Sequence, residues 1–398
     1  MAKAVGLHVH SGRSNRQVEE YIRSAKPTVM KWLADGVDSR LVDLAKVYGA
    51  LTILRVYEPD QLLGNPHEGN FLKKVEGTLQ RFPQIDAHEG YNEAIQRLPD
   101  IRRRAEFDIN LMKLCERYGK KAVIGSFSVG QPQWPATGAP DDWEGYLPAL
   151  RYAAERGHYV GLHEYGGPAM QWGVGENQMT GLVDGRWERI DPATRPGVKG
   201  WFCLRYRRAV EHWRELGLNP IPKIVITEAG LDDIQPRPNV GAKRGYKSYR
   251  ETPYWKHPVL GDFASQLRWQ CERWAEDDYL VGGTVFGFAD ASGQWDDFDL
   301  STDPESYARL VQEMGRLPAG GTPVPTPTPV PTPVPAPPTP PTPPTLAKRY
   351  RPYVLRQGDT LWRVAGSRWR EVLRVQPLGN TSSLPVGTVI MIPVPDEG

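Results

Sequence analysis

Short apolar runs alternate with longer amphipathic stretches through the first 317 residues. Eight runs carry Val, Ile, Leu or aromatic residues, as strands buried on both faces do. The predicted strands are Ala4–His10, Thr28–Leu33, Leu51–Tyr57, Ile85–Asn92, Ala122–Ser128, Tyr159–Glu164, Lys223–Thr227 and Gly282–Phe288. Helices are predicted at Arg16–Ser24, Ser39–Tyr48, Ile101–Tyr118, Trp143–Arg156, Gly200–Leu216 and Ala264–Glu276. This alternation predicts an α/β fold, a (β/α)8 TIM barrel with a parallel sheet.

The composition changes abruptly after the last predicted barrel unit. Ala319–Thr345 contains only Pro, Thr, Val, Ala and Gly, with thirteen prolines between Pro323 and Pro344. Proline fixes φ and lacks a backbone donor, so this segment predicts an extended polyproline spacer. We therefore expect a barrel domain at residues 1–317, a Pro/Thr-rich linker at 318–347 and a small module at 348–395.

Two glutamates end strand-like runs at positions that a barrel brings together. Glu93 ends the fourth run and Glu228 ends the seventh. In a closed barrel these strand ends face one another across the mouth, and two opposed carboxylates can cleave a glycosidic bond. Glu89 and Glu164 are rival carboxylates, and Glu164 is expected to face the other side of its strand.

The barrel resembles clan A of the glycoside hydrolases, from residue 4 to about residue 317. The matching motifs are Asn92-Glu93 after strand four, Glu228 at strand seven, His163-Glu164-Tyr165 at strand six and Arg55 on strand three. The resemblance implies a retaining glycoside hydrolase without a cofactor. In that clan the glutamate after Asn is the acid/base, here Glu93, and the strand-seven glutamate is the nucleophile, here Glu228.

Neighbouring polar side chains have expected roles. Arg55 and Tyr165 are expected to hydrogen-bond Glu228 and keep it ionised. Asn92 is expected to bind the substituent at C2 of the sugar, and His163 to orient Glu93.

Other rim residues complete the predicted substrate site. His8 and His10 point the same way from strand one and line the rim; since no third ligand has convincing spacing, we expect no metal. The sugar platform near strand eight is expected from Phe286 or Phe288 or from Trp295, with Phe288 and Trp295 as the substrate contacts.

The C-terminal module resembles the LysM family over nearly its whole length. The resemblance rests on Gly358-Asp359-Thr360-Leu361-Trp362, Asn380, Val386-Gly387-Thr388 and Ile392-Pro393. It implies a βααβ module that binds glycans containing N-acetylglucosamine, such as peptidoglycan or chitin. The implied glycan contacts are Gly358, Asp359, Thr360, Leu361 and Asn380.

Composition and charge exclude several classes of protein. Hydrophobic residues make up 39% and charged residues 24%, and no apolar run of about 18 residues occurs, so no membrane partner is expected. The net charge is +2, yet Leu346–Gly398 holds eight Lys/Arg against four Asp/Glu, which leaves the barrel slightly acidic and a poor nucleic-acid binder. Cys115, Cys203 and Cys271 are widely spaced and are expected to be free thiols. We expect a monomer.

The sequence favours a polysaccharide hydrolase, with peptidoglycan or a related cell-wall glycan as the expected substrate. Two alternatives remain: an inactive barrel that only binds the wall, and a glycosidase of β-glucan, mannan or chitin. The first residues predict a strand and no signal peptide, so synthesis in the cytoplasm is expected. Action outside the cell or at the wall then requires another route, such as release of a phage-type endolysin or non-classical export.

Overall fold

The structure is a computed structural model that describes fourteen parts of the chain. They are residues 3–58, 67–96, 99–133, 141–166, 170, 182–183, 186–187, 200, 202–232, 245–250, 261–317, 350–354, 373–374 and 389–393. The chain forms two compact units, a barrel and a small C-terminal sheet. None of the described helices combines the length and the hydropathy that crossing a membrane requires.

Eight parallel strands close into a barrel in the order β1-β10-β9-β6-β5-β4-β3-β2. The strands are β1 (Gly6–Val9), β2 (Val29–Leu33), β3 (Leu51–Arg55), β4 (Ala87–Glu89), β5 (Lys121–Phe127), β6 (Tyr159–Gly166), β9 (Lys223–Leu231) and β10 (Leu280–Phe288). Each overlaps one of the eight predicted runs. The predicted TIM barrel is therefore confirmed.

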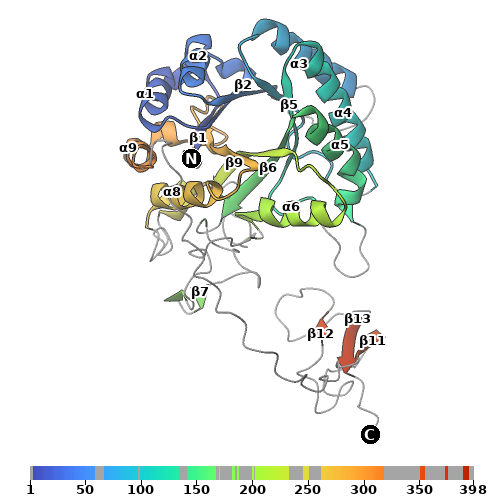
Figure 1. Ribbon diagram of the computed structural model, residues 1–398. Helices are drawn as coiled ribbons and strands as arrows, with labels where there is room; N and C mark the ends of the chain where they lie inside the picture. The colour runs from blue at the N-terminus through green and yellow to red at the C-terminus, as the bar shows by residue number, and fades with distance from the viewer. Residues whose placement is uncertain are drawn as a thin grey trace, which may run out of the picture. The chain divides into compact units, whose positions relative to one another are not determined.

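Helices surround the barrel on its outside (Figure 1). They are α1 (Asn15–Ala25), α2 (Ser39–Val47), α3 (His67–Arg81), α4 (Ile101–Arg117), α5 (Asp142–Arg156), α6 (Arg205–Glu215), α7 (Tyr246–Tyr249), α8 (Phe263–Trp274) and α9 (Pro304–Gly315). Short 3-10 turns lie at Gly12–Ser14, Ala34–Gly36 and Leu300–Thr302. The six predicted helices are present. The helices α3, α7 and α9 were not predicted, and α6 starts five residues later than predicted.

The inside of the barrel is filled in layers. One apolar cluster takes a residue from each of five strands: Val29, Ile53, Ala87, Val123 and Val225. Side chains two positions further along a strand point to the same side. Above this apolar layer the interior therefore receives the polar residues Lys31, Arg55 and Glu89, from β2, β3 and β4.

A short antiparallel sheet is described in the C-terminal unit. Its strands are β11 (Tyr350–Val354), β12 (Leu373–Arg374) and β13 (Val389–Pro393), with β13 in the centre. The predicted opening and closing strands are present and pair with each other; β12 was not predicted. The linker 318–347 and the expected glycan contacts Gly358, Asp359, Thr360, Leu361 and Asn380 lie outside the described residues. A separate two-strand pair, β7 (Leu182–Val183) and β8 (Arg186–Trp187), falls in the long loop after β6.

A buried arginine on α4 holds the segment that follows β4. The Arg104 guanidinium donates to the carbonyl oxygens of Tyr91 (2.8 Å), Ala94 (2.6 Å) and Gly125 (2.7 Å). It also donates to Asp108 at 2.9 Å, and neither Arg104 nor Asp108 is exposed. Since Glu93 lies between Tyr91 and Ala94, this side chain fixes the backbone on both sides of it.

Replacing Arg104 with Met is expected to lower the free energy of unfolding by about 3–5 kcal/mol. The buried Asp108 carboxylate then lacks its arginine partner, and three carbonyl oxygens lose their donor. The exposed neighbour Arg102 is the matched control, and Arg102→Met is expected to change stability by about 0.5 kcal/mol or less. Urea unfolding followed by circular dichroism measures both. Equal losses in the two variants would contradict this account of the loop.

Candidate active site

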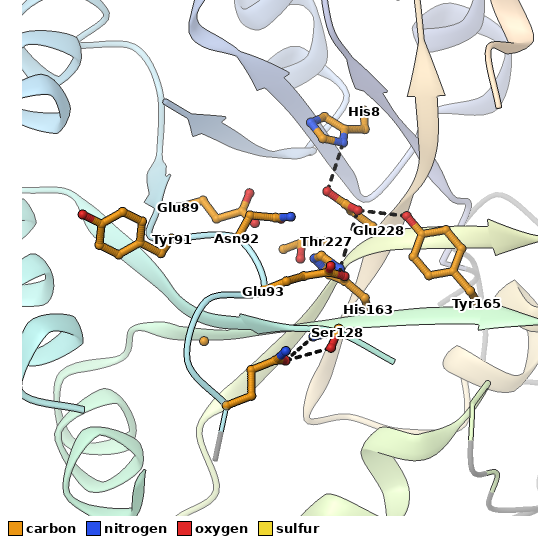
Figure 2. A network of polar contacts seen from close by, with 12 residues as sticks. His8, Glu89, Tyr91, Asn92, Glu93, Ser128, His163, Tyr165, Thr227 and Glu228 are labelled. Atoms are coloured by element: carbon orange, nitrogen blue, oxygen red, sulfur yellow. Dashed lines mark hydrogen bonds and ion pairs between the residues drawn. The ribbon is translucent and has the colours of Figure 1, made fainter. Parts of the chain in front are cut away.

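Most of the predicted site residues meet at the carboxyl ends of the strands. They surround a cavity of about 370 Å³. Eight predicted residues line it: His8, His10, Arg55, Asn92, Glu93, Tyr165, Glu228 and Trp295. Figure 2 shows Glu228 among His8, His163 and Tyr165, with Asn92 and Glu93 close by. The completely buried His163 lies behind the cavity lining.

The two predicted carboxylates come close together. Carboxylate oxygens of Glu93 and Glu228 and a ring nitrogen of His163 all lie within 4.8 Å of one another. The side chain of Glu93 is 41% exposed and that of Glu228 is 6% exposed. Two neighbouring carboxylates thus have different environments, which is what acid and nucleophile roles require.

The backbone positions of the two glutamates differ from the prediction. Glu93 does not end β4; it follows the strand by four residues. Glu228 does not end β9, because the strand continues to Leu231. The predicted convergence of the two side chains nevertheless occurs.

A bulge in β9 turns Glu228 toward the cavity. Leu162 pairs with Ile226, but the next residue, His163, pairs with Glu228, so Thr227 is an extra residue in β9. Strict alternation would place Glu228 on the same side as Ile226, which packs in the outer core. The extra residue reverses the alternation and points Glu228 inward beside His163.

Positive and polar groups hold the Glu228 carboxylate. Its Oε1 accepts hydrogen bonds from Arg55 at 2.9 Å and Lys31 at 3.4 Å, and its Oε2 accepts one from the Tyr165 hydroxyl at 2.8 Å. Burial raises the pKa of Glu228, but the charges of His163, Lys31 and Arg55 and the Tyr165 hydrogen bond outweigh it and lower this pKa to about 2. Glu228 is ionised at any ordinary working pH. The hydrogen bonds expected from Arg55 and Tyr165 are both present.

His163 connects the two carboxylates. Its Nδ1 lies 2.7 Å from Oε1 of Glu93 and 3.5 Å from Oε2 of Glu228. The expected contact between His163 and Glu93 is therefore present. With a proton on Nδ1, the imidazole donates to Oε1 of Glu93 and fixes the orientation of this carboxyl group.

Glu93 has an uncommon backbone conformation. Its φ is +53°, in the left-handed region that residues with a Cβ seldom adopt. Its N–H donates to the carbonyl of Ser126 at 3.0 Å, and Ser126 has φ +45°. Strained residues of this kind persist where surrounding contacts determine them and are concentrated at functional sites.

Asn92 and two histidines complete the polar lining. Oδ1 of Asn92 accepts from Arg55 at 2.7 Å, which leaves the Nδ2 amide as the donor group of this side chain. Burial lowers the pKa of His10 to about 4 and that of His8 well below its usual value, so both rings are neutral at pH 7. Among the described residues, one group offers three potential metal-ligand atoms: Glu93, His163 and Glu228, without His8 or His10. Hydrogen bonding already accounts for its geometry.

The aromatic wall differs from the prediction. Phe286 and Trp295 line the cavity with Phe298, and their rings form edge contacts at centroid distances of 5.2–5.9 Å. Phe288 does not line it; this residue is completely buried and packs on Tyr307 of α9. The prediction for Phe288 is wrong because β10 also has a bulge: Leu7 pairs with Val285 and Val9 with Phe288, which adds one residue and reverses the alternation.

The rival carboxylates do not reach the cavity. Glu164 points outward, as expected, and accepts from Gln270 at 3.0 Å; burial raises its pKa to about 7. Glu89 is buried inside the barrel and pairs with Lys31 at 2.8 Å. Sequence reasoning missed Lys31; the signal available was a lysine within the apolar run Thr28–Leu33.

Three further carboxylates lie in the cavity wall: Asp35, Asp232 and Asp290. Burial raises the pKa of Asp290, but backbone donors at Ser292 and Trp295 outweigh it and lower this pKa, so Asp290 is ionised. Arg55 is the one lysine or arginine among the described lining residues, and it is bound to Glu228. The described part of the cavity lining therefore carries more negative than positive groups.

Comparison with known proteins finds similar structures but no sequence relative. No protein-family model and no curated protein matches the sequence. A β-galacturonidase from Eisenbergiella tayi is similar in structure, with a TM-score of 0.42, 11% identity, and coverage of 79% of this chain and 50% of that one. For a β-glucuronidase from Faecalibacterium prausnitzii the TM-score is 0.47 and the identity 12%, with coverage of 81% of this chain and 50% of that one. For β-glucuronidase 2 from Bacteroides uniformis the TM-score is 0.41 and the identity 11%, with coverage of 72% of this chain and 30% of that one. The chain thus spans half the length of these proteins or less, and identities of 11–12% assign no activity to it.

Proposed function

We propose that this chain is a retaining glycoside hydrolase that acts on a polysaccharide. The observation that carries the proposal is the approach of Glu93 and Glu228 to within 4.8 Å in an open cavity. Retaining enzymes hold their carboxyl groups about 5–5.5 Å apart, whereas inverting enzymes need about 6.5–9.5 Å to admit a water molecule. The short separation favours attack by a carboxylate over direct attack by water.

The two glutamates have separate roles in this reaction. Glu93, the more exposed, donates a proton to the glycosidic oxygen while Glu228 attacks the anomeric carbon. The leaving group departs as an alcohol, and the sugar remains as an ester on Glu228. Glu93, now a carboxylate, takes a proton from water, which attacks the anomeric carbon and releases the sugar with Glu228 restored.

The neighbouring residues stabilise this sequence of charges. Arg55 and Tyr165 keep Glu228 ionised before attack. His163 holds Glu93 in place through Nδ1 and prevents its carboxyl group from rotating away from the leaving oxygen. Asn92, fixed by Arg55, presents its amide to the C2 substituent, a contact that strengthens in the transition state.

A barrel that only binds the wall is the alternative from another class. A binding site has no need for two unlike carboxylates bridged by a histidine, and apolar residues in place of a buried ion pair are often neutral or stabilising. The geometry therefore supports catalysis over binding alone.

The polymer is proposed from the C-terminal module and from the charge of the cavity. A LysM module would hold the enzyme at a wall glycan that contains N-acetylglucosamine, and peptidoglycan is our first candidate. Asp35, Asp232 and Asp290 disfavour a sugar carboxylate in the cavity, so the unit bound there is uncharged, such as N-acetylglucosamine. β-Glucan, mannan and chitin also consist of uncharged sugars, and they are the remaining alternatives.

Removal of each carboxylate is expected to have a distinct effect. Glu228→Ala abolishes turnover, and added azide restores it by attacking from the vacated side, giving a glycosyl azide of inverted configuration. Glu93→Ala slows turnover by about 10²–10⁴-fold with a poor leaving group. Azide then yields a product of retained configuration. Proton NMR of the products distinguishes the two.

Glu164→Gln is the matched control, since this glutamate is buried but faces away from the cavity, and it retains the wild-type product pattern. Activity that survives Glu228→Ala without azide would exclude Glu228 as the nucleophile. A wild-type product of inverted configuration would exclude the retaining mechanism.

The C-terminal module is expected to affect the rate of hydrolysis of insoluble polymers but not that of small soluble substrates. Removing residues 348–398 lowers release of soluble fragments from insoluble peptidoglycan, because tethering raises the effective substrate concentration. It leaves the rate on a soluble aryl glycoside unchanged. Fragment release from peptidoglycan, chitin, β-glucan and mannan identifies the polymer. Equal rates with and without the tail on every insoluble polymer would contradict the anchoring role.

A further inference from the structure

A buried lysine and glutamate lie directly beneath the proposed nucleophile. Nζ of Lys31 is 2.8 Å from Oε2 of Glu89 and 3.4 Å from Oε1 of Glu228. It also donates to the Thr227 carbonyl at 3.3 Å. The side chains of Lys31 and Glu89 are completely buried, and neither residue lines the cavity. They cannot bind substrate, so they act through the side chain that they touch.

We propose that Lys31 and Glu89 form a positioning pair for the proposed glycosidase reaction, holding Oε1 of Glu228 inside the barrel and leaving Oε2 as the oxygen that attacks the sugar. This inference rests on the function proposed above. It adds two residues to that function and assigns the nucleophilic atom.

The two oxygens of Glu228 have different surroundings. Oε1 contacts Arg55 at 2.9 Å and Lys31 at 3.4 Å, and Nδ1 of His8 lies 3.7 Å away. Oε2 contacts the Tyr165 hydroxyl at 2.8 Å and lies 3.5 Å from Nδ1 of His163, the atom that also contacts Glu93. Oε2 is therefore on the side of the acid, where the glycosidic bond must lie.

Strand register explains why the pair lies here. Lys31 and Glu89 follow Val29 and Ala87 by two positions, so their side chains point to the same interior side one layer higher. Glu228 reaches this layer from β9 through the bulge at Thr227. The backbone of three strands fixes the pair, and no loop movement is required.

Glu89 balances the charge of Lys31 both before and after Glu228 bonds to the sugar. Before attack, Lys31 and Arg55 face Glu89 and Glu228, two charges of each sign. When Oε2 bonds to the anomeric carbon, Glu228 becomes a neutral ester and its charge is lost from the layer. Lys31 still has Glu89 at 2.8 Å, so its ammonium group is not left buried without a partner.

Without Lys31, the pKa of Glu228 is set by the remaining titratable and charged groups around it. The titratable and charged groups around Glu228 are His8 and His10 from β1, Arg55 from β3, Glu93 from the loop after β4, and His163 and Tyr165 from β6. Glu89 from β4 lies on the other side of Lys31, which contacts both glutamates. An opposite charge at this distance lowers a carboxyl pKa by about 1–3 units. Loss of Lys31 therefore raises the pKa of Glu228. As the pH falls, Glu228 is then protonated earlier, so the activity that needs its ionised form begins to decline at a higher pH than in the wild type.

The test compares Lys31→Met, Glu89→Gln and the double variant. In Lys31→Met, Glu89 and Glu228 repel each other, so the acid limb of kcat/KM moves up by about 1–3 pH units. Glu89→Gln moves the acid limb to lower pH or leaves it unchanged. The acid limb of the double variant lies between those of the two single variants. The double variant retains no unpaired buried charge, so it remains measurable if Lys31→Met fails to fold.

A second measurement does not depend on catalysis. Carbon-13 NMR of labelled glutamate carboxyls, assigned with Glu228→Gln, follows Glu228 in the enzyme without substrate and is expected to give the same order of pKa values. Arg207→Met removes another buried cation, paired with Glu276 and Asp277, and is expected to lower stability without moving the acid limb or the Glu228 signal.

Two results would overturn the inference. One is an acid limb and a Glu228 titration that stay at their wild-type positions in both Lys31→Met and the double variant. The other is a trapped 2-fluoroglycosyl-enzyme in which the sugar is bonded to the Glu228 oxygen that contacts Arg55. Absence of turnover on every glycan, with the NMR order intact, would instead reject the proposed function and leave the electrostatic pair.

Discussion

The site depends on keeping one carboxylate charged where it is largely shielded from water. Glu228 is almost fully buried, and a buried carboxylate without partners would take up a proton. Arg55, Lys31, His163 and Tyr165 supply positive charge and donors from three different strands, and together they outweigh the effect of burial. Loss of the barrel register would separate these groups, and a Glu228 that stayed buried without them would take up a proton.

The second carboxylate is held in a different way. Glu93 follows β4 on a loop, its side chain is substantially exposed, and His163 is its contact on the inner side. The loop itself is fixed from outside the barrel by Arg104, which donates to carbonyls on both sides of Glu93. A strand thus supports the group that must remain charged, and a pinned loop supports the group that must exchange a proton with solvent.

The sequence predicts the barrel well because its signal is local. Eight buried runs, each followed by an amphipathic stretch, leave little choice of topology. Strand position brings Arg55 and Tyr165 together, and Glu228 joins them through the bulge in β9. The error at Phe288 has a structural cause: a bulge in β10 adds a residue, reverses the alternation and sends this side chain outward. Nothing in a single sequence marks a bulge, since it arises from pairing between strands.

Lys31 and Glu89 were harder to predict for the same reason, because their pairing spans 58 positions and is visible only in three dimensions. Stability does not explain them. Replacing a buried ion pair with apolar residues of similar volume is often neutral or stabilising by about 1–4 kcal/mol, and five strands contribute apolar side chains to the layer below. The stability of the fold therefore does not require a charged layer above the apolar one. The chemistry of Glu228 gives it a reason, because a carboxylate that must be anionic before attack and neutral after it needs cations whose own charge is balanced in both states.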